Sequence, residues 1–258
     1  MKLLEVMWLT CLVMLVVSCS VKEDRDECPC CLVLDMAQVD TSVVKYAEIV
    51  VTASDGYGLR DTLSIEDFEN GYVVDVPRGD VGVGIYCGAS DNVDDKGNLL
   101  IAYGDECPQV YMHASNIMAH GETVVESVAM RKNHCIMTIQ VQAENDFPFR
   151  LEAKGWVDGY ESGGLPSVGN FMYAMYTDSA GACQLVLPRQ TDSSLVLEVH
   201  DDTGILRSFA LGEYVTASGY DWSEADLKDI TVSLDYALTR VVIVVEAWAE
   251  EHVFNVVM

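Results

Sequence analysis

Residues 135–142 read CIMTIQVQ, and their side chains alternate between the two faces of an extended chain. Met137, Ile139 and Val141 fall on one face, and the residues between them fall on the other. The run LVLEV at 195–199 repeats this period of two, which is typical of a half-buried β-strand. Both stretches therefore predict strands.

Similar runs recur along the chain, each rich in Val, Ile, Leu or Tyr and bounded by Gly, Asp, Asn or Pro. We expect strands at 31–37, 46–53, 72–76, 81–87, 99–103, 123–130, 136–143, 149–154, 171–176, 182–188, 194–200, 206–210, 230–236, 240–248 and 252–257. So many short strands exceed the seven to nine of one ordinary β-sandwich. The sequence therefore predicts an all-β protein with two tandem sandwiches. We place their boundary near the basic stretch MRKNHC at 130–135.

Helical signals are sparse. Residues 223–229 read SEADLKD, in which Ser223 can cap a helix and Asp226 can complete a capping-box variant. This pattern predicts one or two helical turns before the strand at 230. Residues 110–119 are a second, less regular helical candidate.

The N-terminal apolar run, residues 6–17, is shorter than the roughly 20 residues that span a bilayer. It follows Lys2 and ends at Ser18, as the apolar core of a signal peptide does. The tetrad VVSC at 16–19 resembles the lipobox of bacterial lipoproteins, which implies cleavage after Ser18 and lipidation of Cys19. An ordinary signal peptide with a chance cysteine is the alternative.

The acidic stretch after Cys19 predicts a solvated tether over residues 19–30. Within it, Lys22, Glu23 and Asp24 resemble the export tag that sends Bacteroidetes-type lipoproteins to the outer face of the outer membrane. The predicted organisation is thus a signal peptide at 1–18, the tether at 19–30, and domains at 31–131 and 132–258.

The charge balance excludes one large class of partners. Removing residues 1–18 takes away Lys2 and Glu5, so 14 of 15 basic and 40 of 41 acidic residues remain, a net charge of -26. Nucleic-acid binding needs Lys and Arg to neutralise phosphates, and this chain has few. A composition that is 50% hydrophobic predicts a folded body rather than disorder.

The cysteines leave their pairing open. Without Cys11 and Cys19, seven remain, so at least one is free or intermolecular. An exported compartment permits disulfides, and Cys28 is the simplest candidate for one. Cys28 and Cys31 have the spacing of a metal-binding pair, but the sequence offers no second pair. No metal is therefore predicted.

The sequence contains no motif of a known catalytic site. G-x-S-x-G, H-E-x-x-H and the P-loop pattern are all absent from it. The glycine-rich stretch GDVGVG at 79–84 lies between strand patterns, with no helix after it to complete a phosphate site. We therefore predict no catalytic residue, no cofactor and no enzymatic activity.

The block at 206–248 carries a family resemblance. Its motifs are GEY at 212–214, YDW at 220–222, DLKDI at 226–230, VSLDY at 232–236 and a closing Trp248. Together with the start at Cys19, this block resembles the anchor and accessory subunit lipoproteins of Bacteroidetes-type (type V) fimbriae. The resemblance implies two Greek-key, transthyretin-like sandwiches.

The same resemblance implies a role. The protein would be a non-enzymatic lipoprotein that holds a fimbria at the outer membrane and contacts the fimbrial shaft subunit through strand or surface pairing. Anchors of this family also resemble terminators, which limit fimbrial length. The resemblance also implies that shaft subunits lose an N-terminal segment to a protease that cleaves after arginine. In this chain only Arg25 precedes Arg60, which favours an anchor that is kept whole over a cleaved shaft subunit. The last strand either forms a hairpin with 240–248 or pairs with a neighbouring subunit.

The rival interpretation is a surface lipoprotein that binds a glycan or another ligand. Sandwich proteins can present aromatic side chains as a binding platform, and Trp156, Tyr160, Tyr220 and Trp222 are the candidates here. Burial in the core is the alternative for most of them, because Trp and Tyr supply large packing areas.

Overall fold

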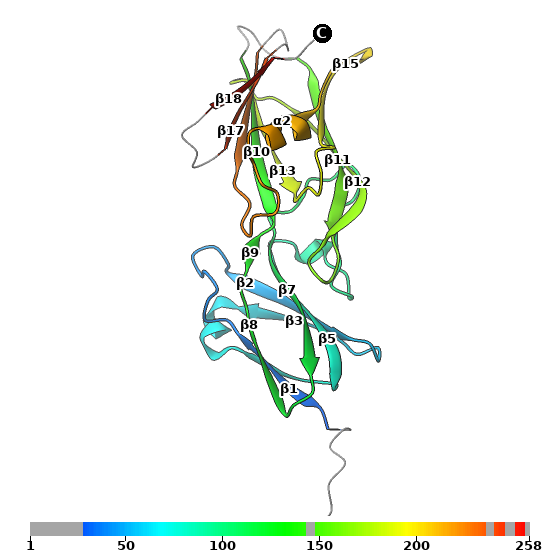
Figure 1. Cartoon of the computed structure of the whole chain (residues 1–258), viewed down its shortest axis with the longest axis vertical. Helices are drawn as coiled ribbons and strands as arrows, with labels where there is room; N and C mark the ends of the chain where they lie inside the picture. The colour runs from blue at the N-terminus through cyan, green and yellow to red at the C-terminus, as the bar shows by residue number, and fades with distance from the viewer. Residues whose placement is uncertain (1–27, 143–147, 236–239, 246–250, 256–258) are drawn as a thin grey trace, which may run out of the picture.

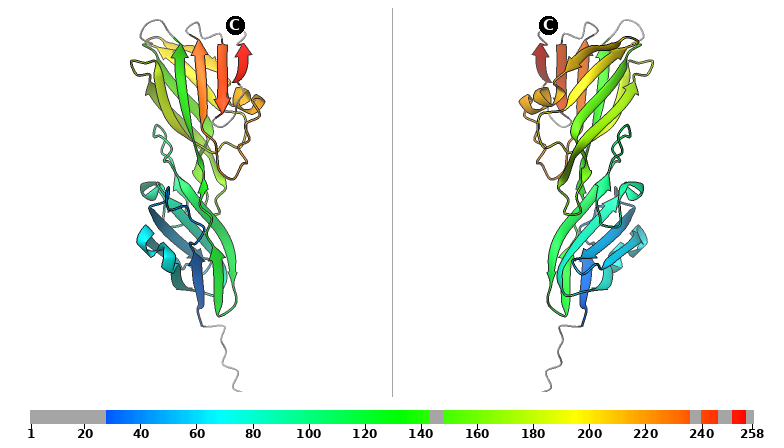
Figure 2. Two further views of the ribbon diagram at one scale, coloured as in Figure 1. Left: turned by 90° about the vertical axis from the view of Figure 1, so that its left-hand side faces the viewer. Right: turned by 90° about the vertical axis from the view of Figure 1, so that its right-hand side faces the viewer.

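The computed structural model describes residues 28–142, 148–235, 240–245 and 251–255 (Figure 1). Cys19, Lys22, Glu23 and Asp24 lie outside these residues. Within them, four β-sheets form two sandwiches that are stacked along the long axis of an elongated molecule. The perpendicular views in Figure 2 show the same arrangement. No helix among the described residues is long and apolar enough to cross a bilayer.

The N-terminal sandwich has a three-stranded and a five-stranded sheet. The smaller sheet has the order β4-β1-β8, and the larger has the order β3-β2-β5-β7-β9. Their bounds are β1 (Cys30–Asp35), β2 (Tyr46–Ala53), β3 (Gly58–Ser64), β4 (Tyr72–Val76), β5 (Gly79–Cys87), β7 (Tyr111–Ala119), β8 (Thr123–Ser127) and β9 (Arg131–Lys132), with 3-10 turns η2 (Ile65–Asn70) and η3 (Ser90–Asn92).

The C-terminal sandwich has two larger sheets. One has the order β13-β10-β16-β17-β18; the other has the order β12-β11-β14-β15, with β6 also paired to β11. Their bounds are β6 (Leu99–Leu100), β10 (His134–Gln142), β11 (Arg150–Tyr160), β12 (Pro166–Tyr176), β13 (Ala182–Pro188), β14 (Val196–Asp201), β15 (Gly204–Phe209), β16 (Ile230–Asp235), β17 (Arg240–Val245) and β18 (Glu251–Asn255), with helix α2 (Leu211–Ala217).

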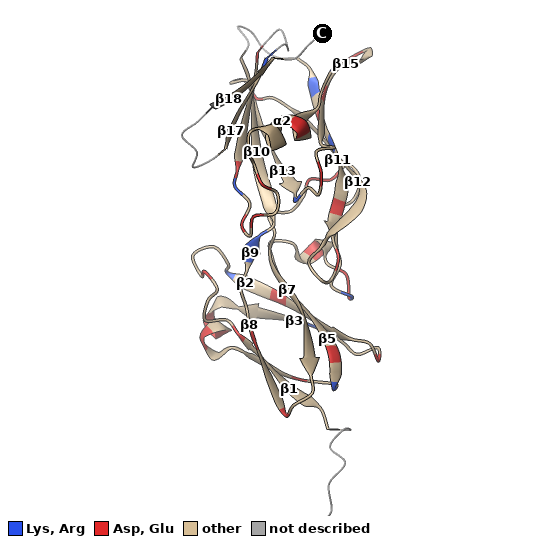
Figure 3. Ribbon diagram, viewed as in Figure 1, with Lys and Arg blue, Asp and Glu red and all other residues tan. Residues whose placement is uncertain are grey.

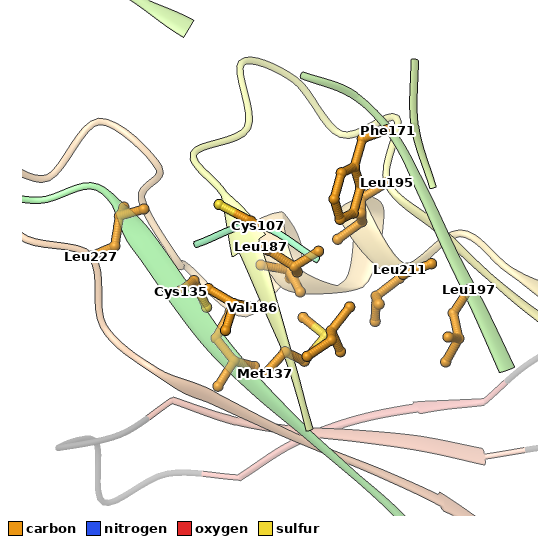
Figure 4. Close-up of a cluster of buried hydrophobic side chains, with 14 of the residues drawn as sticks. Cys107, Cys135, Met137, Phe171, Val186, Leu187, Leu195, Leu197, Leu211 and Leu227 are labelled. Carbon is orange, nitrogen blue, oxygen red and sulfur yellow. The ribbon is translucent and has the colours of Figure 1, made fainter. Parts of the chain in front are cut away.

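The alternation in CIMTIQVQ has the predicted consequence. Met137, Ile139 and Val141 of β10 are buried in the C-terminal core, whereas Gln140 is exposed. Leu197 on the opposite sheet is also fully buried in this core, near Leu211 of α2 (Figure 4). A second cluster of buried residues fills the N-terminal sandwich. The all-β sandwich fold is therefore confirmed.

The two cores are joined through the segment between β5 and β7. Val93, Leu99, Ile101 and Cys107 belong to the core of the C-terminal sandwich although they precede the predicted boundary. The Ile101 amide donates to the Asp158 carbonyl of β11 at 2.8 Å. The division at 131/132 stays a prediction, and the chain contributes to the C-terminal sandwich before that point.

Every predicted strand overlaps an observed strand, but the sequence does not predict three of the observed strands, β3, β7 and β9. Strand β3 was missed because Leu63 is its only buried residue, so it lacks a clear apolar face. Strand β9 has only two residues. Strand β7 occupies 111–119, so the helical prediction for 110–119 is wrong.

The helix predicted at 223–229 is also wrong, because this segment forms turns. The Asp226 and Asp229 carboxylates accept hydrogen bonds from the backbone amides of Lys132 and Ile136, both at 2.8 Å. Because Asp226 and Asp229 bond to these distant amides, their side chains are not available to cap or stabilise a local helix. In the part of the chain that the structure describes, the α-helix is α2, which contains the GEY motif.

Candidate functional site

Of the residues singled out near the N-terminus, the structure describes Cys28 and Cys31. Cys28 is exposed and unpaired, and all seven cysteines among the described residues are free. Cys30 is fully buried in the N-terminal core, and Cys31 is partly buried on the other side of β1. Cys28 forms no disulfide among the described residues, and the disulfide suggested for it stays a prediction.

The last described strand is β18. It pairs antiparallel with β17, with Val253 opposite Val242, so the predicted hairpin pairing is confirmed. Phe254 stacks on Tyr214 of α2 with ring centroids 5.1 Å apart, which ties the strand to the sandwich. In the described sheet order β18 is an edge strand, and an edge strand presents backbone groups that another chain can pair with.

A ladder of charged side chains covers the outer face of β11 and β14. Glu152 lies directly across from Glu198 in the antiparallel pairing, and Arg150 lies across from His200. The Lys154 ammonium lies 2.6 Å from Glu198 Oε2 and 3.1 Å from Glu152 Oε2. We call these five residues the charged ladder.

The charged ladder is electrostatically satisfied by its own cations. Burial alone would raise the pKa of Glu198, but hydrogen bonds from Lys154 and His200 outweigh it and lower that pKa. The hydrogen bond to Glu198 is also the main reason why the pKa of Lys154 is raised. Glu152 is 8% exposed and is paired with Arg150 as well.

The ladder includes three groups that could hold a metal ion. Ligand atoms of Glu152, Glu198 and His200 lie within 4.8 Å of one another. However, the Lys154 ammonium bridges the two carboxylates. The arrangement therefore fits an ion-pair network better than a metal centre, because a bound cation would have to displace the lysine.

Next to the ladder lies a groove of about 550 Å³. Trp156 and Tyr103 border it, with exposed fractions of 53% and 67%. Its remaining lining comes from β11, β12, β14 and the segment before β14, namely Lys154, Gly155, Asn170, Phe171, Met172, Ser194, Val196 and Glu198. We call this the Trp156 groove.

The other predicted platform aromatics do not reach this surface. Tyr160 is fully buried, and Tyr220 and Trp222 are only 5% and 9% exposed. The Tyr220 hydroxyl donates to the Lys228 carbonyl at 2.7 Å, so it has a structural partner. Of the four candidates, Trp156 alone belongs to an exposed platform. Sequence reasoning missed Tyr103, because nothing in its local pattern reveals that its loop folds beside β12.

The YDW and DLKDI motifs form a clasp at the junction of the two sandwiches. Asp226 and Asp229 pair with Arg131 and Lys132 of β9, at 3.2 Å and 2.6 Å. Figure 3 shows this basic strand between the sandwiches. Arg189 extends the contact by donating to backbone carbonyls of 222, 224 and 225. The motifs that carry the family resemblance therefore have a structural role here.

The buried thiol of Cys135 and the partly buried thiol of Cys183 are poor candidates for covalent chemistry. Burial raises the pKa of Cys135 to about 12 and that of Cys183 to about 11. Both thiols therefore stay protonated near neutral pH, whereas the thiolate is the reactive form.

Comparison with known proteins identifies the fold. No protein-family model matches the sequence, and no curated protein matches it. Among solved structures, the fimbrial anchor protein Mfa2 from Porphyromonas gingivalis is similar, with a TM-score of 0.61 at 11% identity, covering 89% of this chain and 100% of that one.

Two Bacteroides structures are similarly close. A protein from Bacteroides thetaiotaomicron described as "putative polysaccharide binding" has a TM-score of 0.59 at 15% identity, covering 88% of this chain and 98% of that one. A "putative adhesin" from Bacteroides ovatus has a TM-score of 0.58 at 15% identity, covering 92% and 98%. The chain therefore shares the all-β sandwich fold of the fimbrial anchor protein Mfa2 and of these two Bacteroides proteins.

Proposed function

We propose that this protein is a non-enzymatic lipoprotein that anchors a fimbria at the outer membrane surface, or serves as one of its accessory subunits. The observation that carries the proposal is the likeness to Mfa2, which extends over the whole of that anchor and 89% of this chain. The sequence supports it independently, through the lipobox at 16–19 and the motifs at 206–248.

The placement of the ends of the fold is compatible with an anchor. The first described residues lie at one pole of the elongated molecule, whereas β18 lies near the other (Figures 1 and 2). In the proposal, lipid on Cys19 holds the first pole at the membrane, and Lys22, Glu23 and Asp24 direct it to the outer face. The cysteine's acyl chains together give stable attachment, which one chain alone does not.

The far pole would then meet the fimbria. The edge of β18 offers a route for strand addition by a shaft subunit, since main-chain hydrogen bonds supply affinity in that mode. Surface pairing without a shared strand is the other route. An anchor that occupies the terminal position can also limit fimbrial length.

Replacing the lipid-bearing residue tests the membrane attachment. We expect Cys19→Ala to abolish incorporation of a radiolabelled or clickable palmitate, because no other group can take its place in the lipobox. Cys11→Ala is the matched control, since it removes a thiol within the same N-terminal segment and leaves the tetrad intact. Persistent labelling of Cys19→Ala would refute lipidation at this residue.

The fimbrial role needs a separate test. Cells that lack the gene should release fimbriae into the medium, and the wild-type gene should restore attachment while the Cys19→Ala gene does not. The measurement compares fimbrial subunits in the cell-bound and released fractions. Firmly attached fimbriae of normal length in the deletion strain would contradict the anchor proposal.

A second candidate function is ligand binding at the surface. The observation that favours it is the Trp156 groove, with two exposed aromatic side chains beside polar groups. One structure with this fold is described as "putative polysaccharide binding". The two functions are compatible, because the groove lies on a sheet face and β18 lies on a sheet edge.

A further inference from the structure

The position of Trp156 is set by an irregularity in β11. The pairing of β11 with β12 shifts register between Gly155 and Val157. Val157 is buried, whereas Trp156 points outward and is 53% exposed. A bulge of this kind re-aims a side chain and is frequent beside binding sites.

The bulge is supported from below. A Cβ atom on Gly155 would lie 2.9 Å from Gln190 Oε1 and 3.5 Å from a methyl group of Leu195. Gln190 is 3% exposed, and its amide donates to the Pro188 carbonyl at 2.8 Å. The backbone at Gly155 thus packs closely against Gln190 and Leu195, which restrains the position from which the indole of Trp156 projects.

The polar wall of the groove is also held in position. Lys154 and Glu198 line the groove and belong to the charged ladder, where their 2.6 Å contact restrains both side chains. Exposed Asn170 and half-buried Ser194 contribute further polar groups. Groups fixed before binding lose little conformational entropy when a ligand arrives.

We propose that the Trp156 groove binds an uncharged oligosaccharide. A pyranose ring has an apolar C–H face and a rim of hydroxyl groups. The face matches the indole of Trp156 and the ring of Tyr103, and the hydroxyls match the donors and acceptors of Lys154, Asn170 and Glu198. This inference rests on the second candidate function and is independent of the anchor role.

Charge selects among glycans. The protein has a formal net charge of -26, and the carboxylate of Glu198 lines the groove itself. The positive charge of Lys154 is already paired with two glutamates. A sugar carboxylate or sulfate would therefore meet repulsion without a free cation to offset it, whereas an uncharged sugar would not.

Binding can be measured with the full lipoprotein purified in detergent. The probes are cellohexaose, xylohexaose, mannohexaose and maltohexaose, with hexagalacturonate as the anionic comparison, and calorimetry gives the dissociation constants. We expect at least one uncharged probe to bind. Trp156→Ala should weaken that binding about tenfold or more, because it removes a central contact surface.

Tyr176→Ala is the matched control. Tyr176 is 67% exposed on the same strand pair, but it lines a separate pocket near Arg150 and His200. This variant should bind as the wild type does. Trp156→Phe should retain part of the affinity, because it keeps an aromatic face. Unchanged thermal unfolding of all three variants would show that they fold normally.

Three results would overturn the proposal: no uncharged probe binds, hexagalacturonate binds more tightly than every uncharged probe, or Trp156→Ala binds as well as the wild type. Loss of fimbrial attachment in Trp156→Ala cells without any glycan binding would instead assign the groove to a protein partner. The anchor proposal fails by a different observation, because its test scores fimbriae in cells that lack the gene.

Discussion

At the scale of single residues, the charged ladder shows how an acidic chain uses its few cations. Arg150 and Lys154 both pair with the largely buried carboxylate of Glu152, and Lys154 also pairs with Glu198. Buried carboxylates are costly unless they are paired and hydrogen-bonded. The ladder therefore keeps the face beside the Trp156 groove ordered.

Lys154→Met tests this role. We expect it to destabilise the fold by about 1–2 kcal/mol at pH 7, because it deprives the largely buried carboxylates of Glu152 and Glu198 of one partner each. Lys228→Met is the control, since Lys228 is similarly exposed and pairs with the more exposed Glu224. Urea unfolding measures both, and equal losses in the two variants would contradict the special role of Lys154.

The pH dependence of Glu198 follows from the sign of its shift. The folded state lowers its pKa below the ordinary 4.5, so its stabilising contribution is present above that pH and is lost as the pH falls through the folded value. The stability difference between the wild type and Lys154→Met should therefore shrink below about pH 4.5. Urea unfolding at pH 7, 5 and 4 measures it, and a difference independent of pH would argue against this explanation.

At the scale of elements, helix α2 depends on a close approach of backbone to backbone. The Gly212 amide donates to the Leu195 carbonyl at 2.7 Å. A Cβ atom on Gly212 would lie 2.4 Å from the Ser193 carbonyl oxygen. The glycine of the GEY motif is thus required by packing, and α2 in turn supports β18 through Tyr214 and Phe254.

Gly212→Ala is therefore expected to destabilise the protein by about 2 kcal/mol or more, through overpacking. Helix propensity alone would predict the opposite sign, since alanine is favoured over glycine within helices. Gly58→Ala is the matched control, because a Cβ atom there meets nothing within 4 Å. Thermal or urea unfolding decides, and a neutral Gly212→Ala would show that α2 can shift to accommodate the methyl group.

At the scale of the whole molecule, the two sandwiches are joined by more than the chain at β9. Residues between β5 and β7 are buried in the C-terminal core, and the clasp ties Asp226 and Asp229 to β9. We therefore expect the wild type to unfold in one cooperative transition.

The double variant Asp226→Ala/Asp229→Ala should broaden or split the unfolding transition measured by calorimetry, because it removes both ion pairs between the clasp and β9. Glu66→Ala/Glu69→Ala is the control, since it changes the charge equally at exposed positions of η2. An unchanged single transition in the clasp variant would show that the segment between β5 and β7 is sufficient to couple the cores.

The sequence by itself determined the fold class and most strand positions. Period-two runs such as CIMTIQVQ bury one face whatever they pack against, so alternation alone marks Met137, Ile139 and Val141 as core residues. The lipobox and the acidic tether are also local patterns, and their reading at Cys19, Lys22, Glu23 and Asp24 stays a prediction.

Only the tertiary structure decided which aromatic side chains are exposed and which segment is helical. Both Trp156 and Trp222 are candidate platform aromatics in the sequence, but a bulge turns Trp156 outward while Trp222 packs into the C-terminal core. Residues 223–229 have a helical pattern, yet Asp226 and Asp229 bind amides of residues 132 and 136. Contacts between residues so distant in the chain depend on how the sheets meet, and therefore leave no trace in local periodicity.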